Sequence, residues 1–294
     1  MARKSRPFAV KKTPYFLILP AILYYIFFWI RPVINGVITS FQSETGAFTL
    51  EYYTFILTEP VYRQALINTA IFSSTSVVIQ YLLALFIALT LSKRFKGSKL
   101  MLFIAMMPMA LPQTAVAVLW KTGLVTNGWV NSVINYVGLS DSQFPWLALQ
   151  GAQSVLFLVL IDTWTVLPSV MIILVAGLQN FPVEMQEAGY VFGATRWQVL
   201  KDITIPILKP TIITSIILRL IASIQVWSIA VMLFGYGRMP FLVERVAYYV
   251  EVASRANDSI RVATATAVFV SAMIMVTAAI YLRVSKKNSI LEVQ

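Results

Sequence analysis

Cysteine and histidine are both absent from the 294-residue chain, and charged residues make up only 12% of it. Without these two side chains the protein has no disulfide, no thiol nucleophile, no imidazole base, and no thiolate or imidazole metal ligand. We therefore expect no catalytic residue and no metal site. The scarcity of charge, compared with roughly 25% in soluble domains, indicates that most of the chain lies in lipid.

A nucleotide-binding signature is also missing. The chain contains no Gly-x-x-x-x-Gly-Lys-Ser/Thr phosphate loop, the motif whose backbone amides cradle the phosphates of ATP. Because the motif is absent, we do not expect the protein to draw energy from ATP through it.

Apolar residues dominate what is present, at 59% of the chain. A bilayer core about 30 Å thick requires about 20 apolar residues per helix. Six stretches are long enough, at residues 15–40, 67–91, 100–122, 151–177, 207–234 and 262–283. The sequence therefore predicts an all-α integral membrane protein with six transmembrane helices in a single transmembrane domain, residues 13–284.

Positive charge is distributed unevenly over the loops. Lys and Arg gather in the N-terminus 1–12, the linker 93–99, the segment 196–209 and the residues 283–287. The positive-inside rule places this richer side in the cytoplasm. We therefore expect both termini, including a tail at 285–294, to be cytoplasmic.

Residues 180–210 are too polar for the bilayer and fall on the cytoplasmic side, between the fourth and fifth spans. The pattern predicts a short helix that Asn180 caps and Gly193 ends. Thr195-Arg196-Trp197-Gln198 then has the form of a capping box that opens a second helix. Pro206 and Pro210 are expected to bend or break the chain before the fifth span.

The first helix of this loop carries an apolar stripe from Met185 to Phe192, with residues recurring every three or four positions. Such a stripe suits either the lipid surface or a protein partner. The exposed face of the helix also carries Glu184 and Glu187. Because anionic headgroups repel carboxylates, we favour a protein partner.

The same loop resembles the signature of the permease subunits of binding-protein-dependent ABC importers. That signature reads Glu-Ala-Ala, three residues, Gly, about nine residues, Ile, any residue, Leu-Pro. The matching residues here are Glu187-Ala188-Gly189, Gly193-Ala194, Ile203 and Ile205-Pro206. The sequence departs from it in having Gly189 for the second Ala, Phe192 where sugar-type members usually have Asp, and Ile205 for Leu.

Similarity to the maltose-type carbohydrate branch of this family extends over most of the chain. It includes Asn68-Thr69, Pro108, Pro112, Trp120, Asn131 and Gly177-Leu178-Gln179. The resemblance implies a permease subunit in a bacterial or archaeal cytoplasmic membrane that translocates a sugar, with a di- or oligosaccharide expected.

The resemblance also implies partners. In the family, a second permease subunit completes the pathway, two cytoplasmic ATPase subunits bind ATP and Mg, and an extracytoplasmic solute-binding protein delivers substrate. This chain would form a heterodimer with the second permease and would bind no cofactor and no nucleic acid itself. Its loop would be the coupling helix between helices 4 and 5, and the residues implied in coupling are Glu184, Glu187, Ala188, Gly189, Phe192, Gly193, Ala194, Trp197 and Pro206.

Two ionisable residues fall inside predicted spans at comparable depth, Asp162 in the fourth and Arg219 in the fifth. An isolated charge there costs about 3 kcal/mol or more, so such residues face a protein interior or a wet cavity. We expect either a buried ion pair or substrate contact. Polar and aromatic residues at similar depth are Gln80, Thr163, Trp164, Gln225, Trp227 and Ser228, and the candidate pathway residues are Asp162, Trp164, Arg219, Gln225 and Trp227.

The segment 235–258 falls on the extracytoplasmic side, where an ordinary solvated loop is expected. Its tyrosines and mixed charges also suit contact with a binding protein, the role that the resemblance implies.

Two other functions remain open on the sequence. The first alternative is an ion-gradient-driven secondary transporter or channel, which usually displays internal repeats or several intramembrane carboxylates. The second is a membrane enzyme, which the missing His and Cys disfavour.

Overall fold

The computed structural model describes residues 13–92, 95–252 and 259–291. The basic N-terminus 1–12, residues Lys93 and Arg94 of the basic linker, the end of the 235–258 segment and residues 292–294 lie outside the described part. Within that part the chain is built from helices, and its only β pairing is an isolated bridge between Gln42 and Phe48.

The helices follow one another along the chain with short connections. In order they are α1 (Thr13–Tyr25), the π-helical η1 (Ile26–Ile30), α2 (Arg31–Ser40), α3 (Glu51–Thr58), α4 (Pro60–Ser92), α5 (Ser98–Met106), the 3₁₀ turn η2 (Met107–Ala110), α6 (Gln113–Leu124), α7 (Trp129–Tyr136), the 3₁₀ turn η3 (Trp146–Ala148), α8 (Ala152–Gln179), α9 (Val183–Val191), α10 (Arg196–Gln198), the π-helical η4 (Val199–Thr204), α11 (Ile205–Ile224), α12 (Ser228–Phe234), α13 (Leu242–Glu251) and α14 (Ser259–Leu291).

The predicted membrane spans are present. Five helical segments of the described chain are long and apolar enough to cross a bilayer, and the number is six if a bent pair of helices forms one span. The five are Phe16–Ser40, Pro60–Ser92, Ala152–Gln179, Arg196–Ile224 and Ser259–Arg283. The all-α membrane fold that the sequence predicts is therefore confirmed.

Two of the expected spans differ in shape from the prediction. The third is not one straight helix, because Ser98–Ala110 and Gln113–Leu124 meet at an angle of 93°. Pro108 lies in the first turn of η2 and Pro112 caps α6, so the bend lies where proline cannot donate a helical hydrogen bond. The fifth span ends at Ile224, ten residues earlier than expected, and α12 follows as a separate short helix.

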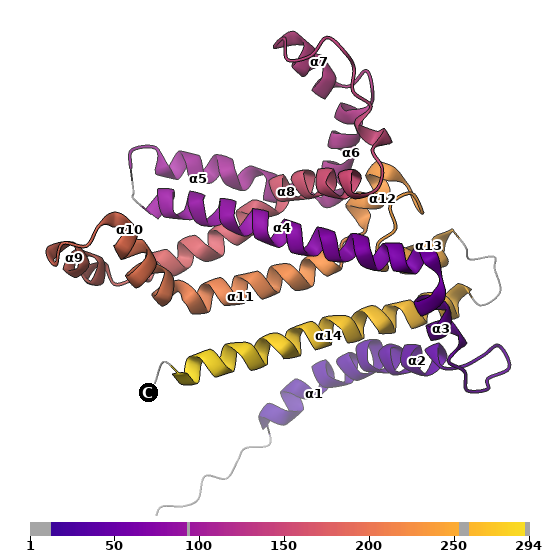
Figure 1. Cartoon of the computed structure of the whole chain (residues 1–294). Coiled ribbons are helices and arrows are strands. Elements are labelled where there is room, and N and C mark those ends of the chain that lie inside the picture. Colours follow the sequence, from indigo (N-terminus) through magenta and orange to yellow (C-terminus); the bar gives the residue numbers. More distant parts are fainter. Residues whose placement is uncertain (1–12, 93–94, 253–258, 292–294) are drawn as a thin grey trace, which may run out of the picture.

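Two ends of the helix bundle can be distinguished in Figure 1. At one end lie α9, α10, the start of α1 and the end of α14, whereas α3 and α13 lie at the other. Long helices α4, α8 and α11 pack together between these ends, and α2 packs on α14. Helix α14 continues to Leu291, so the predicted tail at 285–294 is helical over most of its length.

The buried apolar residues form separate clusters along the bundle. One buried cluster joins α4, α6, α8 and α12, and includes Phe72, Val116, Leu158 and Ile229. A second cluster packs α13 and α14 on α3 and the start of α4. The most apolar part of the segment Phe16–Ser40 has no buried residue within the chain, as suits a helix whose apolar side chains meet lipid or another subunit.

Candidate functional site

A short helical loop projects from the end of the bundle where α8 stops and α11 begins (Figure 1). Helix α9 starts after Pro182 and ends at Val191, and Gly193 follows it with a φ of +82°. A positive φ suits glycine because it has no Cβ. The turn glycine that the loop signature predicts is therefore in the expected conformation.

The predicted capping box at the start of α10 is confirmed. The Thr195 backbone N–H donates to Gln198 Oε1 at 2.7 Å, and the Gln198 backbone N–H donates to Thr195 Oγ1 at 3.3 Å. These two bonds satisfy amides that would otherwise lack a partner at the start of a helix. The direction of α10 is thus set by its own local sequence.

Two predictions for this loop are wrong. Asn180 does not cap α9. It ends α8, and its backbone N–H donates to the Ala176 carbonyl oxygen, because the apolar pattern of α8 continues to Gln179. The break expected at Pro206 and Pro210 is absent, since the residues Arg196–Ile224 form one continuous helical segment. The bend, which was the other expectation, stays a prediction. A π-helical turn, η4, lies directly before Pro206, and such turns are a known way for a helix to absorb a local disruption.

The outer surface of the loop is apolar at its tip. The exposed fractions are 83% for Val191, 90% for Phe192 and 67% for Trp197. Glu184, Glu187 and Ala188 are exposed as well. Large apolar side chains at such exposure, next to carboxylates, are typical of a protein-binding surface.

Gly189 and Ala194 of the signature contact their own chain, whereas Pro206 does not lie buried against it. A Cβ on Gly189 would lie 2.8 Å from Ile203 Cδ1 and 3.2 Å from Val199 Cγ2, so this glycine lets α9 approach η4 closely. Ala194 donates its backbone N–H to the Gly189 carbonyl oxygen at 3.0 Å. Pro206 is exposed at the start of α11.

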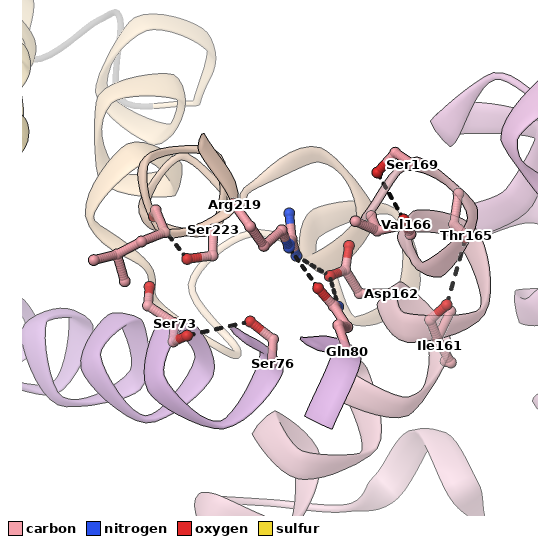
Figure 2. Close-up of polar contacts among 11 residues, drawn as sticks. Ser73, Ser76, Gln80, Ile161, Asp162, Thr165, Val166, Ser169, Arg219 and Ser223 are labelled. Atoms are coloured by element: carbon pink, nitrogen blue, oxygen red, sulfur yellow. Dashed lines mark hydrogen bonds and ion pairs between the residues drawn. The ribbon is translucent and has the colours of Figure 1, made fainter. Parts of the chain in front are cut away.

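A second candidate site lies midway along the bundle, where three helices meet. Arg219 of α11 forms an ion pair with Asp162 of α8, and its Nε donates to Gln80 Oε1 of α4. Gln80 Nε2 in turn donates to Asp162 Oδ2 at 2.9 Å. Figure 2 shows the three side chains converging from their separate helices. The expectation that Asp162 and Arg219 pair is confirmed.

A cavity of about 120 Å³ adjoins this pair. Its lining residues are Gln113, Asp162, Arg219, Ala222, Gln225, Val226, Trp227, Ser228 and Ile229. Four of the five candidate pathway residues, Asp162, Arg219, Gln225 and Trp227, therefore surround one space. Trp227 and Ser228 reach it because the chain breaks between α11 and α12.

Trp164 is the candidate that does not line this cavity. Its ring packs edge-on against Trp120, with the centroids 5.8 Å apart. Residues two apart on a helix point in different directions, so Trp164 cannot share the face of Asp162.

Gln113 is a lining residue that the sequence analysis missed. It accepts a hydrogen bond from Ser228 Oγ at 3.0 Å, which links α6 to α12. A polar amide directly after Pro112, in an otherwise apolar span, was the available signal.

The described part of the segment 235–258 is not the solvated loop that we expected. Glu244 and Arg245 are buried and form a bidentate ion pair with N···O distances of 2.6 and 2.7 Å. Glu244 Oε1 also accepts from the Gly237 backbone N–H at 2.9 Å. Through the bond from Gly237, Glu244 links α13 to the turn after α12. The local sequence did not predict this arrangement.

Tyr236, a half-buried residue of this segment, forms a hydrogen bond to α13. Tyr236 donates its hydroxyl to Glu251 Oε2 at 2.5 Å. Desolvation, followed by this hydrogen bond, raises the pKa of Tyr236 to about 12, so its hydroxyl remains a donor at neutral pH.

Comparison with known proteins shows the family of this chain. Residues 80–289 match the family described as binding-protein-dependent transport system inner membrane component. The trehalose/maltose transport system permease protein MalF of Thermococcus litoralis is 31% identical over 235 residues, which cover 77% of this chain and 78% of that protein. The sulfoquinovosyl glycerol transport system permease protein SmoG of Agrobacterium fabrum is 27% identical over 277 residues, covering 91% and 88%.

A solved structure shares the fold. It is the crystal structure of a bacterial ABC transporter involved in the import of the acidic polysaccharide alginate, and one of its chains aligns with a TM-score of 0.83 at 21% identity. The alignment covers 94% of this chain and 95% of that chain.

Proposed function

The chain belongs to the family of binding-protein-dependent transport system inner membrane components, and we propose that it is the permease subunit of an ABC importer that moves a sugar across the cytoplasmic membrane. The named relatives act on trehalose and maltose or on sulfoquinovosyl glycerol, which supports a sugar or glycoside as substrate. Each of these relatives aligns over most of its length, so the proposal concerns the whole transport function.

The observation that carries the proposal is the projecting loop 180–206. Val191, Phe192 and Trp197 are exposed on it beside two carboxylates, and its stiff connection to α11 could transmit a movement. We propose that separate ATPase subunits, with their ATP and Mg, receive this loop. Closure of the ATPases would then shift α11 relative to its neighbours and alternate the access of the pathway.

The other assignments follow from this proposal. The loop end of the bundle, together with both termini, would be cytoplasmic, and the α3 and α13 end would face the solute-binding protein. A second permease, most simply a different chain, would complete the pathway. Substrate would pass the cavity beside Asp162 and Arg219, where Gln225 and Trp227 offer hydrogen bonds and a ring face. Trp164, which lies outside the cavity, is no longer proposed as a contact.

The test uses the importer assembled in nanodiscs from this chain, its neighbouring permease, the ATPase and the binding protein. We expect the double variant Phe192→Ser/Trp197→Ser to lose most of the ATPase that co-purifies with the wild type, because the apolar contact is removed. The sugar-loaded binding protein should then no longer stimulate ATP hydrolysis.

Tyr136→Ser provides the matched control, since Tyr136 is 93% exposed on α7 at a distance from the loop. This variant should retain the ATPase, because α7 lies far from the loop. If the loop variant behaves like the control, the coupling role fails and an ion-gradient-driven transporter becomes the better explanation.

A further inference from the structure

The ion pair between the long helices leaves the cavity beside it without net charge. Arg219 directs its Nη2 to Asp162 and its Nε to Gln80, while Gln80 Nε2 donates to the same Asp162 oxygen. The amide of Gln80 thus bonds both partners and holds them in register (Figure 2). Each charge is therefore neutralised by its partner.

The rest of the described cavity wall is uncharged. Besides Asp162 and Arg219, its polar groups are the amides of Gln113 and Gln225, the Ser228 hydroxyl and the Trp227 indole. The cavity of about 120 Å³ is several times the roughly 10–15 Å³ that a cavity needs to hold one water molecule. In this conformation it can receive a few hydroxyl groups along one edge of a sugar ring.

The comparisons do not decide whether the substrate of this chain is neutral or charged. Maltose and trehalose are neutral, whereas alginate is an acidic polysaccharide. A buried carboxylate or sulfonate requires a cation that is not already neutralised, because desolvating an unpaired anion is costly. Here the one cation of the wall is already paired with Asp162, and that carboxylate would repel a second anion.

A sugar hydroxyl, by contrast, requires no free cation. It donates one hydrogen bond and accepts others, and this wall presents a carboxylate, guanidinium N–H groups, two amides and a hydroxyl in one small space. A neutral sugar can therefore use the free hydrogen-bonding positions without displacing the ion pair.

We propose that this cavity selects an uncharged sugar unit over a uronic or sulfonated one, and that the Asp162–Gln80–Arg219 arrangement is what excludes the acidic substrates. The inference rests on the proposed function, because it takes this cavity as part of the sugar pathway. Gln80 acts in it as a positioning residue.

The experiment measures sugar binding to the importer in nanodiscs, without the binding protein, whose own selectivity would mask that of the permease. The probes are radiolabelled maltose, trehalose and lactose as neutral sugars and a mannuronate disaccharide as the acidic one, in equilibrium dialysis with and without a non-hydrolysable ATP analogue. We expect the wild type to bind at least one neutral sugar about tenfold more tightly than mannuronate, because an anion would lack a free cation.

Asp162→Asn is the informative variant, because it leaves Arg219 charged and unpaired. Its preference should move toward mannuronate by about tenfold or more, the size expected for one charge-assisted hydrogen bond. Asp162→Asn/Arg219→Gln, which is neutral again, should return the preference to neutral sugars. Asp141→Asn removes the same charge from an exposed loop residue and should change nothing.

Equal or tighter binding of mannuronate by the wild type would overturn the inference, as would an unchanged preference in Asp162→Asn when its partner subunits still co-purify. Absence of measurable sugar binding by the wild type would overturn the inference too. In that case, stimulation of the ATPase by a sugar-loaded binding protein would show that the importer function stands and only the site is wrong.

Discussion

At the scale of single residues, the Asp162–Arg219 pair is the feature with the largest energetic consequence. Both groups lie inside membrane-spanning helices, and each is the other's ionic partner. A buried pair contributes little by itself compared with apolar residues, but removing one partner leaves an uncompensated charge. The pair therefore constrains which substitutions the three helices tolerate.

This asymmetry leads to a double-mutant prediction. Asp162→Ala alone should lower the free energy of unfolding by about 3 kcal/mol, because Arg219 is left without its counter-ion. Asp162→Ala/Arg219→Ala should cost clearly less. Thermal unfolding of the purified complexes, analysed as a double-mutant cycle, measures the difference, and equal losses in both variants would show that the pair is not coupled.

At the scale of elements, the connection between the loop and α11 determines whether a movement of the loop reaches the membrane-spanning helices. Helices α10 and α11 are joined through η4 without a break, so we expect a displacement at Trp197 to be carried into the fifth span. The sequence predicted a bend or a break there, because Pro206 and Pro210 usually interrupt helices, and the break is absent. A rigid connection transmits a rigid-body motion better than a flexible one.

Two exposed residues of η4, Lys201 and Asp202, allow this to be tested without disturbing packing. Lys201→Gly/Asp202→Gly should keep the ATPase bound, because the apolar tip is intact, while stimulation by the loaded binding protein falls severalfold. Each glycine lowers helix stability by about 1 kcal/mol.

Lys201→Ala/Asp202→Ala removes the same side chains without the added flexibility and serves as the control. ATP hydrolysis and sugar uptake should both be close to wild type in it. If both pairs of substitutions have the same effect, the side chains matter and the stiffness does not.

At the scale of the whole molecule, orientation in the membrane relates the two sites to their partners. The loop, the start of α1 and the end of α14 share one end of the bundle (Figure 1), as an even number of spans requires. The basic residues of the sequence favour the cytoplasm for that end. The α7 and α13 segments then belong outside, where a binding protein would dock.

The natural absence of cysteine makes this orientation simple to measure. Ser140→Cys lies in an exposed loop after α7. It should react with a membrane-impermeant maleimide in cells whose inner membrane is intact and whose outer barrier lets the reagent reach that membrane. Lys201→Cys should react only after the membrane is opened. The reverse pattern would invert the topology and place the loop away from any cytoplasmic ATPase.

What the sequence determined by itself is local in origin. The length of each apolar stretch predicts a span, and the capping box and Gly193 define the turn of the loop, because these signals act within a few residues. The same locality explains two of the errors, since Asn180 and the two prolines favour helix ends that the neighbouring residues override.

Only the tertiary structure decided the rest. Asp162 is 82 residues from Gln80 and 57 from Arg219, so their meeting depends on how α4, α8 and α11 pack. The break that brings Trp227 to the same cavity, the 93° bend of the third span and the burial of Glu244 with Arg245 likewise depend on contacts between distant segments. The pattern of apolar and polar residues in the sequence predicts which helices form, whereas the cavity and its charge arise from the way those helices pack on one another.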